Sequence, residues 1–273
     1  MAGSDDAKSS RSVVSKVLSL LDAFSPATAE PTLNELARRT GLPLSTTYRL
    51  ASELVAWGGL ERVKGGGYRV GLRLWEIGSL APRGADVRAV ALTFMQDLHE
   101  ATREHVHLAV LDGREALYLE TITGRRGPNL RSRRGGRVPL HATGVGKVLL
   151  AYAPVAFVEN VIATGLERYT SHTITAPGLL RRALADIRRT GVGYAREELT
   201  IGSVSVASPL LNAEGGAVAA LSIVAGSGRV DLRRLAPAVR TAALCAARRV
   251  RGETRADEDA GPDPVVTGGH VPP

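Results

Sequence analysis

Five side chains that could contact a polyanion recur along one side of the segment from residue 44 to 54. They are short hydroxyls, one phenol ring and one guanidinium: Ser45, Thr46, Tyr48, Arg49 and Ser52. When a helix lies in the major groove of DNA, groups of these kinds reach phosphate oxygens and base edges. The positions between them are spaced i, i+3, i+4 and i+7, as on a buried helical stripe, and are Thr47, Leu50, Ala51 and Leu54. The segment is therefore predicted to be an amphipathic helix with a nucleic-acid-binding face.

A second short helix is expected just before this one. Thr32 and Glu35 have the spacing of a capping box, so that helix begins at Thr32, and Gly41 provides its end. Pro43 suits the first turn of the following helix, because a proline lacks the N–H that would be unbonded there. Two short helices separated by a sharp turn are typical of a helix-turn-helix, and Thr32 joins the candidate DNA contacts.

The flanking segments favour a DNA-binding domain over a purely structural helical hairpin. Upstream, an additional helix is predicted from the helical spacing of Val14, Val17, Leu18 and Leu21. Downstream, two short strands at 60–63 and 68–70 enclose a glycine turn and form a wing. The wing carries cations suited to the phosphate backbone: Arg62, Lys64 and Arg69. Residues 11–71 are therefore predicted to be a winged helix-turn-helix domain.

Composition limits the remaining possibilities. The 273 residues allow two domains, and the formal net charge of +8 fits a polyanionic partner without requiring one. Cys245 is the single cysteine, so no intrachain disulfide can form, and we expect a reducing cytoplasm and a core-filling role for this thiol. The N-terminal residues do not resemble a signal peptide, and no apolar run approaches the roughly 20 residues that span a bilayer. We expect no membrane contact.

Two helices are expected to connect the winged domain to the rest of the chain. Residues 72–85 are predicted to be a linker helix containing Leu72, Leu74, Trp75, Ile77 and Leu80. A solvent-exposed helix would not need so much apolar area, so this helix is a candidate contact between two copies of the chain. A further helix is expected from about residue 86 to 103. The two ends, 1–10 and 252–273, are polar or turn-forming and are predicted to be disordered.

The stretch from 86 to 251 mixes helical and strand periodicities and is predicted to be one α+β domain. Residues 105–111 and 116–122 form a hairpin about Asp112 and Gly113. Three helices follow, at 144–152, 154–164 and 177–189. Strands then return at 193–196, 203–211 and 217–224, before a last helix from about 232 to 250.

Three ordered segments of this chain resemble the signature regions of the IclR-type bacterial transcription regulators. They are Gly41–Leu50, Leu140–Ala151, and Glu197–Gly202 continuing through Ala219–Ile223. The resemblance covers about residues 12–250. It implies a winged helix-turn-helix domain, a linker helix and a GAF-like effector domain with a six-stranded antiparallel sheet. It also implies a homodimer, or a dimer of dimers, on a palindromic double-stranded DNA operator.

An anion site is expected where the chain enters the helix at Gly144. Free backbone N–H groups and the helix dipole converge there, and a carboxylate is the natural guest. The resemblance maps an effector pocket onto Ala142, Gly144, Val145, Ser205 and Ser222. Ala195 and Val224 stand where family members that bind small polar acids can carry polar groups, which favours a larger or more apolar acid.

An arginine cluster precedes this site. It comprises Arg125, Arg126, Arg131, Arg133, Arg134 and Arg137. A solvated loop and strand edge is one interpretation of the cluster. The alternative is that Arg131 or Arg133, on alternate sides of a strand, pairs with a ligand carboxylate. His141 beside the pocket is expected to be a packed or capping side chain.

The chain lacks the residues that known enzyme motifs need at their characteristic spacings. Gly144–Lys147 resembles the end of a phosphate loop, but His141 occupies the position of its first glycine and Val148 that of its Ser or Thr. His99–Arg103 lacks the second histidine of a zincin, and His105 and His107 lie two apart on a strand. No nucleophile elbow occurs. We therefore expect no enzyme, no metal and no cofactor.

These observations predict a DNA-bound regulator whose affinity for DNA changes when a small carboxylic acid fills the effector pocket. Repression of a catabolic or metabolic operon is the preferred interpretation. Activation by a member of the same family is one alternative. A GAF-like ligand sensor whose DNA reader is degenerate is the other.

Overall fold

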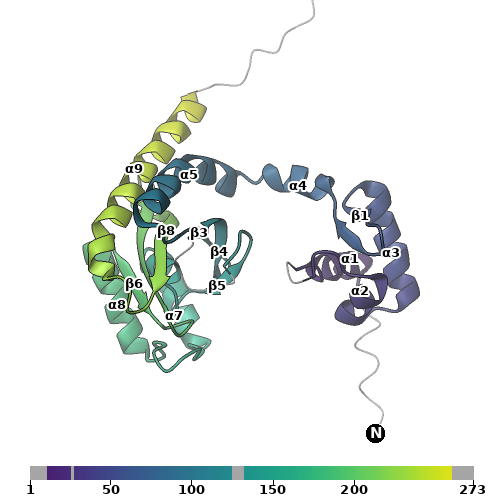
Figure 1. Cartoon of the computed structure of the whole chain (residues 1–273), viewed down its shortest axis with the longest axis horizontal. Helices are drawn as coiled ribbons and strands as arrows, with labels where there is room; N and C mark the ends of the chain where they lie inside the picture. The colour runs from purple at the N-terminus through teal and green to yellow at the C-terminus, as the bar shows by residue number, and fades with distance from the viewer. Residues whose placement is uncertain (1–10, 26–27, 125–131, 260–273) are drawn as a thin grey trace, which may run out of the picture. The chain divides into compact units, whose positions relative to one another are not determined.

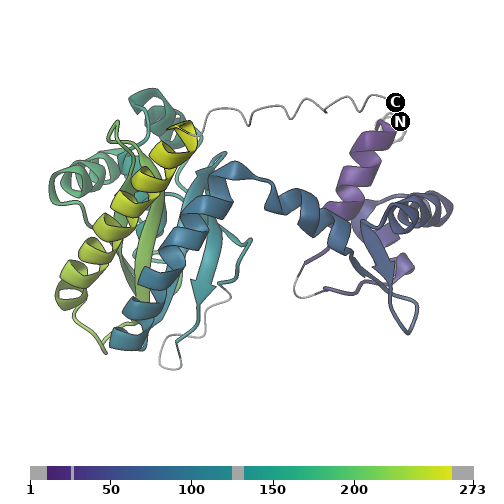
Figure 2. The ribbon, with the colours of Figure 1, turned by 90° about the horizontal axis from the view of Figure 1, so that it is seen from above.

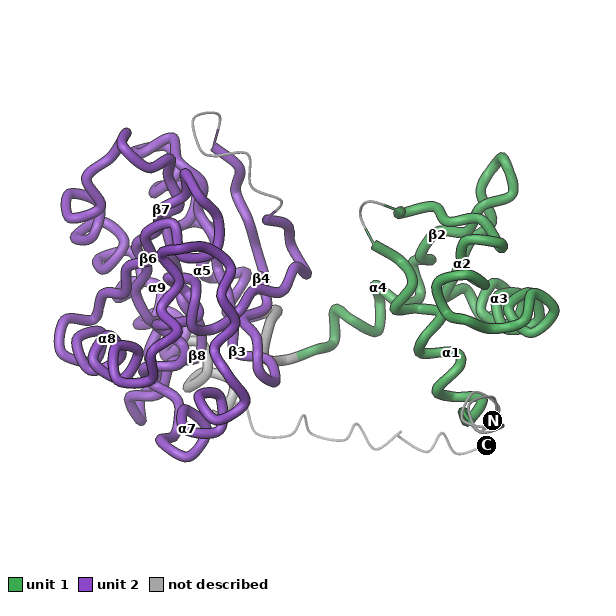
Figure 3. The backbone as a smooth tube through the Cα atoms, turned by 90° about the horizontal axis from the view of Figure 1, so that it is seen from below, with its two compact units in different colours: residues 1–82 green, residues 83–273 purple. Residues whose placement is uncertain are grey.

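The computed structural model describes residues 11–25, 28–124 and 132–259, with backbone alone at 82–85 and 253–259. The chain divides into two compact units, residues 1–82 and 83–273, coloured separately in Figure 3. No helix within the described ranges is both long and apolar enough to cross a membrane. Each unit is described separately below.

The described part of the first unit contains four helices and a two-stranded antiparallel wing. Figure 1 shows how they are arranged. In chain order the unit's elements are α1 (Val13–Asp22), α2 (Leu33–Thr40), α3 (Leu44–Trp57), β1 (Leu60–Arg62), β2 (Tyr68–Val70) and α4 (Leu72–Ser79). This order confirms the predicted winged helix-turn-helix.

Local capping chemistry sets the ends of the short helices. Thr32 accepts a hydrogen bond from the Glu35 N–H while the Glu35 carboxylate accepts one from the Thr32 N–H, so the predicted capping box is confirmed. Gly41 ends α2 in the left-handed conformation at φ 66°. Pro43 is the N-cap of α3 rather than part of its first turn, because its carbonyl accepts the first helical hydrogen bond, from Thr47 N, while its own ψ is extended.

A small core holds the first unit together. It joins all three leading helices to the wing through Leu20, Leu36, Leu50, Leu60 and Tyr68. The predicted inward stripe of α3 is confirmed, since Thr47, Leu50, Ala51 and Leu54 are buried. The stripe predicted for α1 is wrong in part, because Val14 and Leu18 are exposed and Leu20 faces the core instead.

The second unit is built on one six-stranded antiparallel sheet with the order β5-β4-β3-β8-β7-β6. Its strands are β3 (His105–Asp112), β4 (Glu115–Ile122), β5 (Arg137–Pro139), β6 (Gly193–Arg196), β7 (Ser203–Leu211) and β8 (Ala217–Gly226). The predicted hairpin and the three later strands are confirmed. β5 lies at Arg137–Pro139, so the expectation of a strand around Arg131 and Arg133 is wrong for Arg133, and Arg131 lies outside the described residues.

Helices cover both faces of this sheet (Figures 1 and 2). On one face lie α5 (Pro82–Thr102) and α9 (Leu232–Asp259), which contact alternate strand residues such as Val106, Val206 and Ile223. On the other lie α6 (Gly144–Ala151), α7 (Val155–Ala163) and α8 (Pro177–Thr190), packed on the intervening residues, including Ala109, Ala207 and Ala220. The period-2 pattern of the strands therefore fills two cores at once, which confirms the α+β prediction.

Three expectations about the second unit's helices need correction. α5 begins at Pro82 rather than near residue 86, and proline suits that first helical position, so the linker helix α4 ends at Ser79 rather than at residue 85. α9 runs to Asp259, so disorder from residue 252 is wrong for 252–259, where Glu, Arg and Ala favour a helix. Cys245 is exposed rather than buried in the core. Residues 1–10 and 260–273, also expected to be disordered, lie outside the described residues.

The backbone of Gly71 lies against the end of α3, so a side chain at this position should lower the stability of the first unit. An added Cβ would stand 2.2 Å from the Gly58 carbonyl oxygen, which is backbone and cannot rotate away. Gly71→Ala should destabilise the first unit by about 2 kcal/mol or more in urea unfolding. Gly78→Ala is the control, since its Cβ meets nothing within 4 Å inside a helix, and it should stabilise by about 0.5–1 kcal/mol. Equal stability of the two variants would contradict the close approach.

Candidate functional site

The polar face of α3 is accessible. Ser45, Tyr48 and Arg49 are exposed, while Thr46 and Ser52 are half-buried. The Ser52 hydroxyl is itself covered and has no hydrogen-bond partner among the described residues. Thr32 is exposed and is used in the capping box. The helix thus presents a polar strip with one aromatic and one cationic side chain.

Neighbouring side chains engage three of the four predicted DNA-binding cations. Arg49 pairs with Glu53 at 2.9 Å, and Arg69 pairs with Glu61 at 2.7 Å. The Arg62 guanidinium lies 5.6 Å from the Tyr48 ring centroid and 5.4 Å from that of Tyr68. Lys64 at the wing tip has no such partner within the described part of the chain. Exposed ion pairs of this kind contribute about 0–1 kcal/mol, so phosphates can replace the carboxylates.

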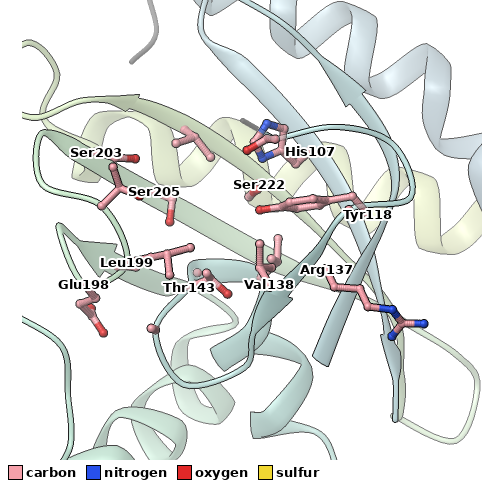
Figure 4. Close-up of a pocket in the computed structure, with 18 of the residues that line it drawn as sticks. His107, Tyr118, Arg137, Val138, Thr143, Glu198, Leu199, Ser203, Ser205 and Ser222 are labelled. Carbon is pink, nitrogen blue, oxygen red and sulfur yellow. The ribbon is translucent and has the colours of Figure 1, made fainter. Parts of the chain in front are cut away.

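The second unit holds a cavity of about 270 Å³ between the N-terminus of α6 and the sheet (Figure 4). It brings together every predicted effector residue that the structure describes: Ala142, Gly144, Val145, Ala195, Ser205, Ser222, Val224 and Arg133. These residues come from the α6 entry, from β6, β7 and β8, and from the turn before β5. Two serines from neighbouring strands and one helix N-terminus therefore line the same cavity.

The entry to α6 exposes unused backbone donors. Thr143 caps the helix by accepting from the Gly146 N–H at 3.1 Å, and its hydroxyl donates to the Pro139 carbonyl at 2.9 Å. The N–H groups of Gly144 and Val145 have no partner among the described residues. Both belong to the first helical turn, where the helix dipole also favours an anion. This arrangement can bind a carboxylate without a cationic side chain.

Gly144 is required at this point because the sheet is so close. A Cβ there would lie 2.7 Å from Ser205 Oγ and 3.5 Å from the Ala207 Cβ. The glycine therefore lets the helix entry pack directly against β7, which places the Ser205 hydroxyl beside the first N–H groups of α6 at the cavity wall.

Sequence reasoning missed the aromatic wall of the cavity. His107 on β3 and Tyr118 on β4 line it, with ring centroids 4.8 Å apart in an edge-to-face arrangement. Burial, reinforced by His105, lowers the pKa of His107 to about 3, so its ring is neutral at physiological pH. Burial raises the pKa of Tyr118 to about 12. Strand alternation could have indicated that His107 faces inward, but not which strand lies beside β3.

The cavity wall contains further polar and apolar groups that were not predicted. They include Ser132, Val138, Thr143, Glu198, Leu199, Thr200 and Ser203. Figure 4 shows the Leu199 side chain directed into the space. His141 lies outside this wall; it is buried, and its Nε2 is 2.9 Å from the Glu167 carbonyl, as expected for a packed side chain.

The arginines near the cavity differ in their availability. Arg137 pairs with Asp112 and Glu115, and Figure 4 shows its side chain turned away from the space. A guanidinium nitrogen of Arg134 lies 3.7 Å from a carboxylate oxygen of Glu120. Arg133 is exposed at the wall and has no ion-pair partner within the described residues. Arg133 is therefore the described member of the cluster best able to approach a guest carboxylate.

A buried ion pair supports the cavity from behind. Lys147 Nζ on α6 lies 2.6 Å from Glu198 Oε1 in the β6–β7 connection, with side-chain exposures of 2% and 8%. Burial lowers the pKa of Lys147, and the Glu198 charge opposes that effect. Glu198 Oε1 also accepts from the Arg196 N–H at 3.3 Å. Lys147, which resembled a phosphate-loop lysine, instead ties the helix to the wall that contains Leu199 and Thr200.

Two family models match this chain, one in each unit. The IclR helix-turn-helix domain matches residues 13–64, and the C-terminal domain of bacterial IclR transcriptional regulators matches residues 81–250. This chain belongs to the IclR family. It is accordingly a DNA-binding transcription regulator with a separate effector-binding domain, which confirms the resemblance noted in the sequence.

Individual relatives are similar to this chain along most of their length. This IclR-family protein is 34% identical over 226 residues to the regulator XynR of Escherichia coli, covering 82% of this chain and 89% of that one. It is 31% identical over 218 residues to the repressor AllR of Klebsiella pneumoniae, covering 78% and 79%. A solved IclR homologue of Microbacterium hydrocarbonoxydans, complexed with 4-hydroxybenzoate, has a TM-score of 0.82 and 34% identity, covering 88% and 100%.

These relatives are regulators, in keeping with the expectation of a non-enzymatic role. Within the described residues no group of three or more histidine, cysteine or acidic side chains is placed to hold a metal ion.

Removing one partner of the buried ion pair should be costly. Lys147→Met leaves the Glu198 charge buried and uncompensated, so we expect a loss of about 3–5 kcal/mol of unfolding free energy. Lys147→Met combined with Glu198→Gln should recover most of that loss, because no buried charge remains. The control is Arg189→Met, which breaks the exposed pair with Asp186 and should cost less than about 1 kcal/mol. Denaturant unfolding measures all three, and a double variant as unstable as Lys147→Met would refute the argument.

Proposed function

We propose that this IclR-family protein represses a catabolic or metabolic operon and that a small carboxylic acid changes its affinity for the operator. The observation that carries the proposal is the cavity of the second unit, which unbonded N–H groups of α6 and strand serines line together. The name of the Klebsiella relative supports repression, and the 4-hydroxybenzoate complex of the Microbacterium homologue supports an acid as guest.

The chemistry of the cavity fits an acid with an apolar body. The Gly144 and Val145 N–H groups can receive the carboxylate, and Ser205 or Ser222 can donate one further hydrogen bond of about 1 kcal/mol. Ala195, Val224 and Leu199 offer apolar surface beside these donors. Arg133 at the wall is available to pair with the same carboxylate.

The acid regulates only if it binds one state of the protein better than another. A coupling of about 1–3 kcal/mol between cavity and operator would change operator affinity by roughly 5–150-fold. A transcription assay gives the sign of the effect. Operator release with rising transcription supports repression, whereas binding with rising transcription would identify an activator instead.

We further propose that the protein acts as a dimer, or as a dimer of dimers, on a palindromic operator. One winged domain covers half a site, so two-fold symmetry of the DNA requires two-fold symmetry of the protein. The linker helix α4 supports this, because Leu72, Trp75 and Leu80 are 70%, 65% and 78% exposed within one chain.

Substitutions on the winged domain should separate two kinds of DNA contact. Arg49→Ala on α3 should weaken operator binding by about 1–3 kcal/mol and relax sequence preference. Lys64→Ala on the wing should weaken binding to all sequences alike and reduce the slope of log affinity against log salt by about one. Gel shifts with the upstream DNA of the gene, across a salt series, measure both effects. Unchanged operator binding by Arg49→Ala would remove that residue from the interface.

Gly144→Val should abolish the response to the acid, because the new side chain would clash with Ser205 and displace the helix entry at which the carboxylate is proposed to bind. Operator affinity without acid should stay within about twofold, since the winged domain is a separate unit. The control is Gly178→Val, at a position where an added Cβ meets nothing within 4 Å. Calorimetry and gel shift with a panel of acids including 4-hydroxybenzoate measure the outcome. A folded Gly144→Val protein that still responds would place the effector elsewhere.

The assembly can be measured directly. Light scattering at micromolar concentration should give the mass of a dimer or tetramer, and Trp75→Glu should shift it toward the monomer, because a charge would lie in an apolar contact. Arg73→Glu on the same helix, which reverses a charge and breaks the exposed ion pair with Glu76, is the control for a charge change outside the apolar contact. A monomeric wild-type protein would contradict the proposed assembly.

A further inference from the structure

His107 is the most deeply buried ionisable ring at the cavity, and one of its two ring nitrogens has no hydrogen-bond partner among the described residues. The side chain is 1% exposed, and the nitrogen without a partner is Nδ1. A buried polar atom without a partner destabilises the structure that buries it, so a ligand that supplies the missing partner gains affinity. Figure 4 shows the ring beside Ser222 and Tyr118, at the edge of the space where the guest would lie.

The position of His107 relative to the anion site follows from the strand register. Gly144 lies over Ser205 on β7, whereas His107 on β3 pairs with Ser222 on β8, the strand between them. Two strand spacings therefore separate the two points along the sheet, or about 10 Å. A two- or three-carbon acid cannot contact both, whereas an acid with a ring between its two polar ends can.

The charge state of His107 restricts what it can recognise. Because burial holds the ring neutral, it offers one N–H donor and one lone pair rather than a cation. A hydroxyl, which both donates and accepts, complements such a ring. A second carboxylate would be desolvated there without a counter-charge.

We propose that His107 determines effector specificity by hydrogen bonding to a hydroxyl at the end of a ring-containing acid opposite to its carboxylate. This inference rests on the proposed function, since it assumes that the carboxylate binds at the entry to α6. Tyr118 packs edge-on against the imidazole and supplies an aromatic surface for the guest ring.

The first test compares matched ligands on the wild-type protein by calorimetry. The probes are 4-hydroxybenzoate, benzoate, benzene-1,4-dicarboxylate and lactate. 4-Hydroxybenzoate should bind at least tenfold more tightly than benzoate, and the dicarboxylate and lactate should bind more weakly than benzoate. Equal affinity for 4-hydroxybenzoate and benzoate, or preference for lactate, would overturn the specificity role and leave the proposed function standing. Failure of all four to bind would overturn both.

The second test uses variants of the same ring. His107→Phe keeps an aromatic ring, somewhat larger than the imidazole, and removes both ring nitrogens, so it should bind benzoate within about threefold of wild type while the preference for 4-hydroxybenzoate falls to about one. His107→Gln retains a donor and an acceptor and should keep part of the preference. The control is His99→Phe on α5, on the other face of the sheet, which should keep the full preference.

Two outcomes of the variant test would overturn the assignment. A folded His107→Phe protein that retains the tenfold preference removes His107 from recognition. Loss of the preference in Tyr118→Phe but not in His107→Phe assigns the hydroxyl contact to Tyr118 instead. Thermal unfolding checks that each variant is folded, and the wild-type ligand series decides independently if His107→Phe is not.

Discussion

The buried ion pair between Lys147 and Glu198 fixes the geometry on which the effector cavity depends. It joins α6, whose N-terminus supplies the backbone donors, to the β6–β7 connection, which supplies Leu199 and Thr200. The same connection is held from its other side, where the Thr173 hydroxyl donates to the Glu198 carbonyl at 2.6 Å. Because separating two desolvated charges leaves each of them uncompensated, the helix entry and the opposite wall are constrained to one arrangement. A guest therefore meets a preorganised site rather than a loop that must first be ordered.

Under the proposed function, backbone dipoles and the exposed Arg133 are the groups of the cavity that attract an anion. Its aromatic wall is neutral at His107, and Arg137 is neutralised by its own acidic partners. The unbonded N–H groups at Gly144 and Val145 are fixed in direction by the helix, so they need no side-chain ordering when a carboxylate arrives. Such a site distinguishes acids by the shape and polarity of the rest of the molecule, because every carboxylate satisfies the helix end equally well.

The parts of the structure that sequence could predict are those set by local chemistry. The capping box at Thr32, the left-handed Gly41 and the alternation along β7 and β8 each follow from residues close together in the chain. The glycine-rich start of α6 could be predicted for the same reason, whereas its role as an anion site stays a prediction. The aromatic wall could not, since His107 reaches Ser222 only through pairing between strands more than a hundred residues apart. Likewise, nothing near Lys147 in the sequence indicates that its partner is Glu198.

The proposed DNA contacts of the first unit are exposed, whereas the proposed ligand contacts of the second unit are buried. This difference suits a regulator. The winged domain holds Arg49 and Arg69 in exposed ion pairs, and if these arginines contact DNA as proposed, phosphates can replace the carboxylates at little cost. The effector domain keeps its decisive groups buried, where a single unmatched hydrogen bond changes affinity severalfold. Coupling between the sites is reciprocal, so a ligand that weakens operator binding is itself bound more weakly on the operator by the same factor. A buried and selective cavity can therefore control an exposed and exchangeable DNA contact with only a few kcal/mol.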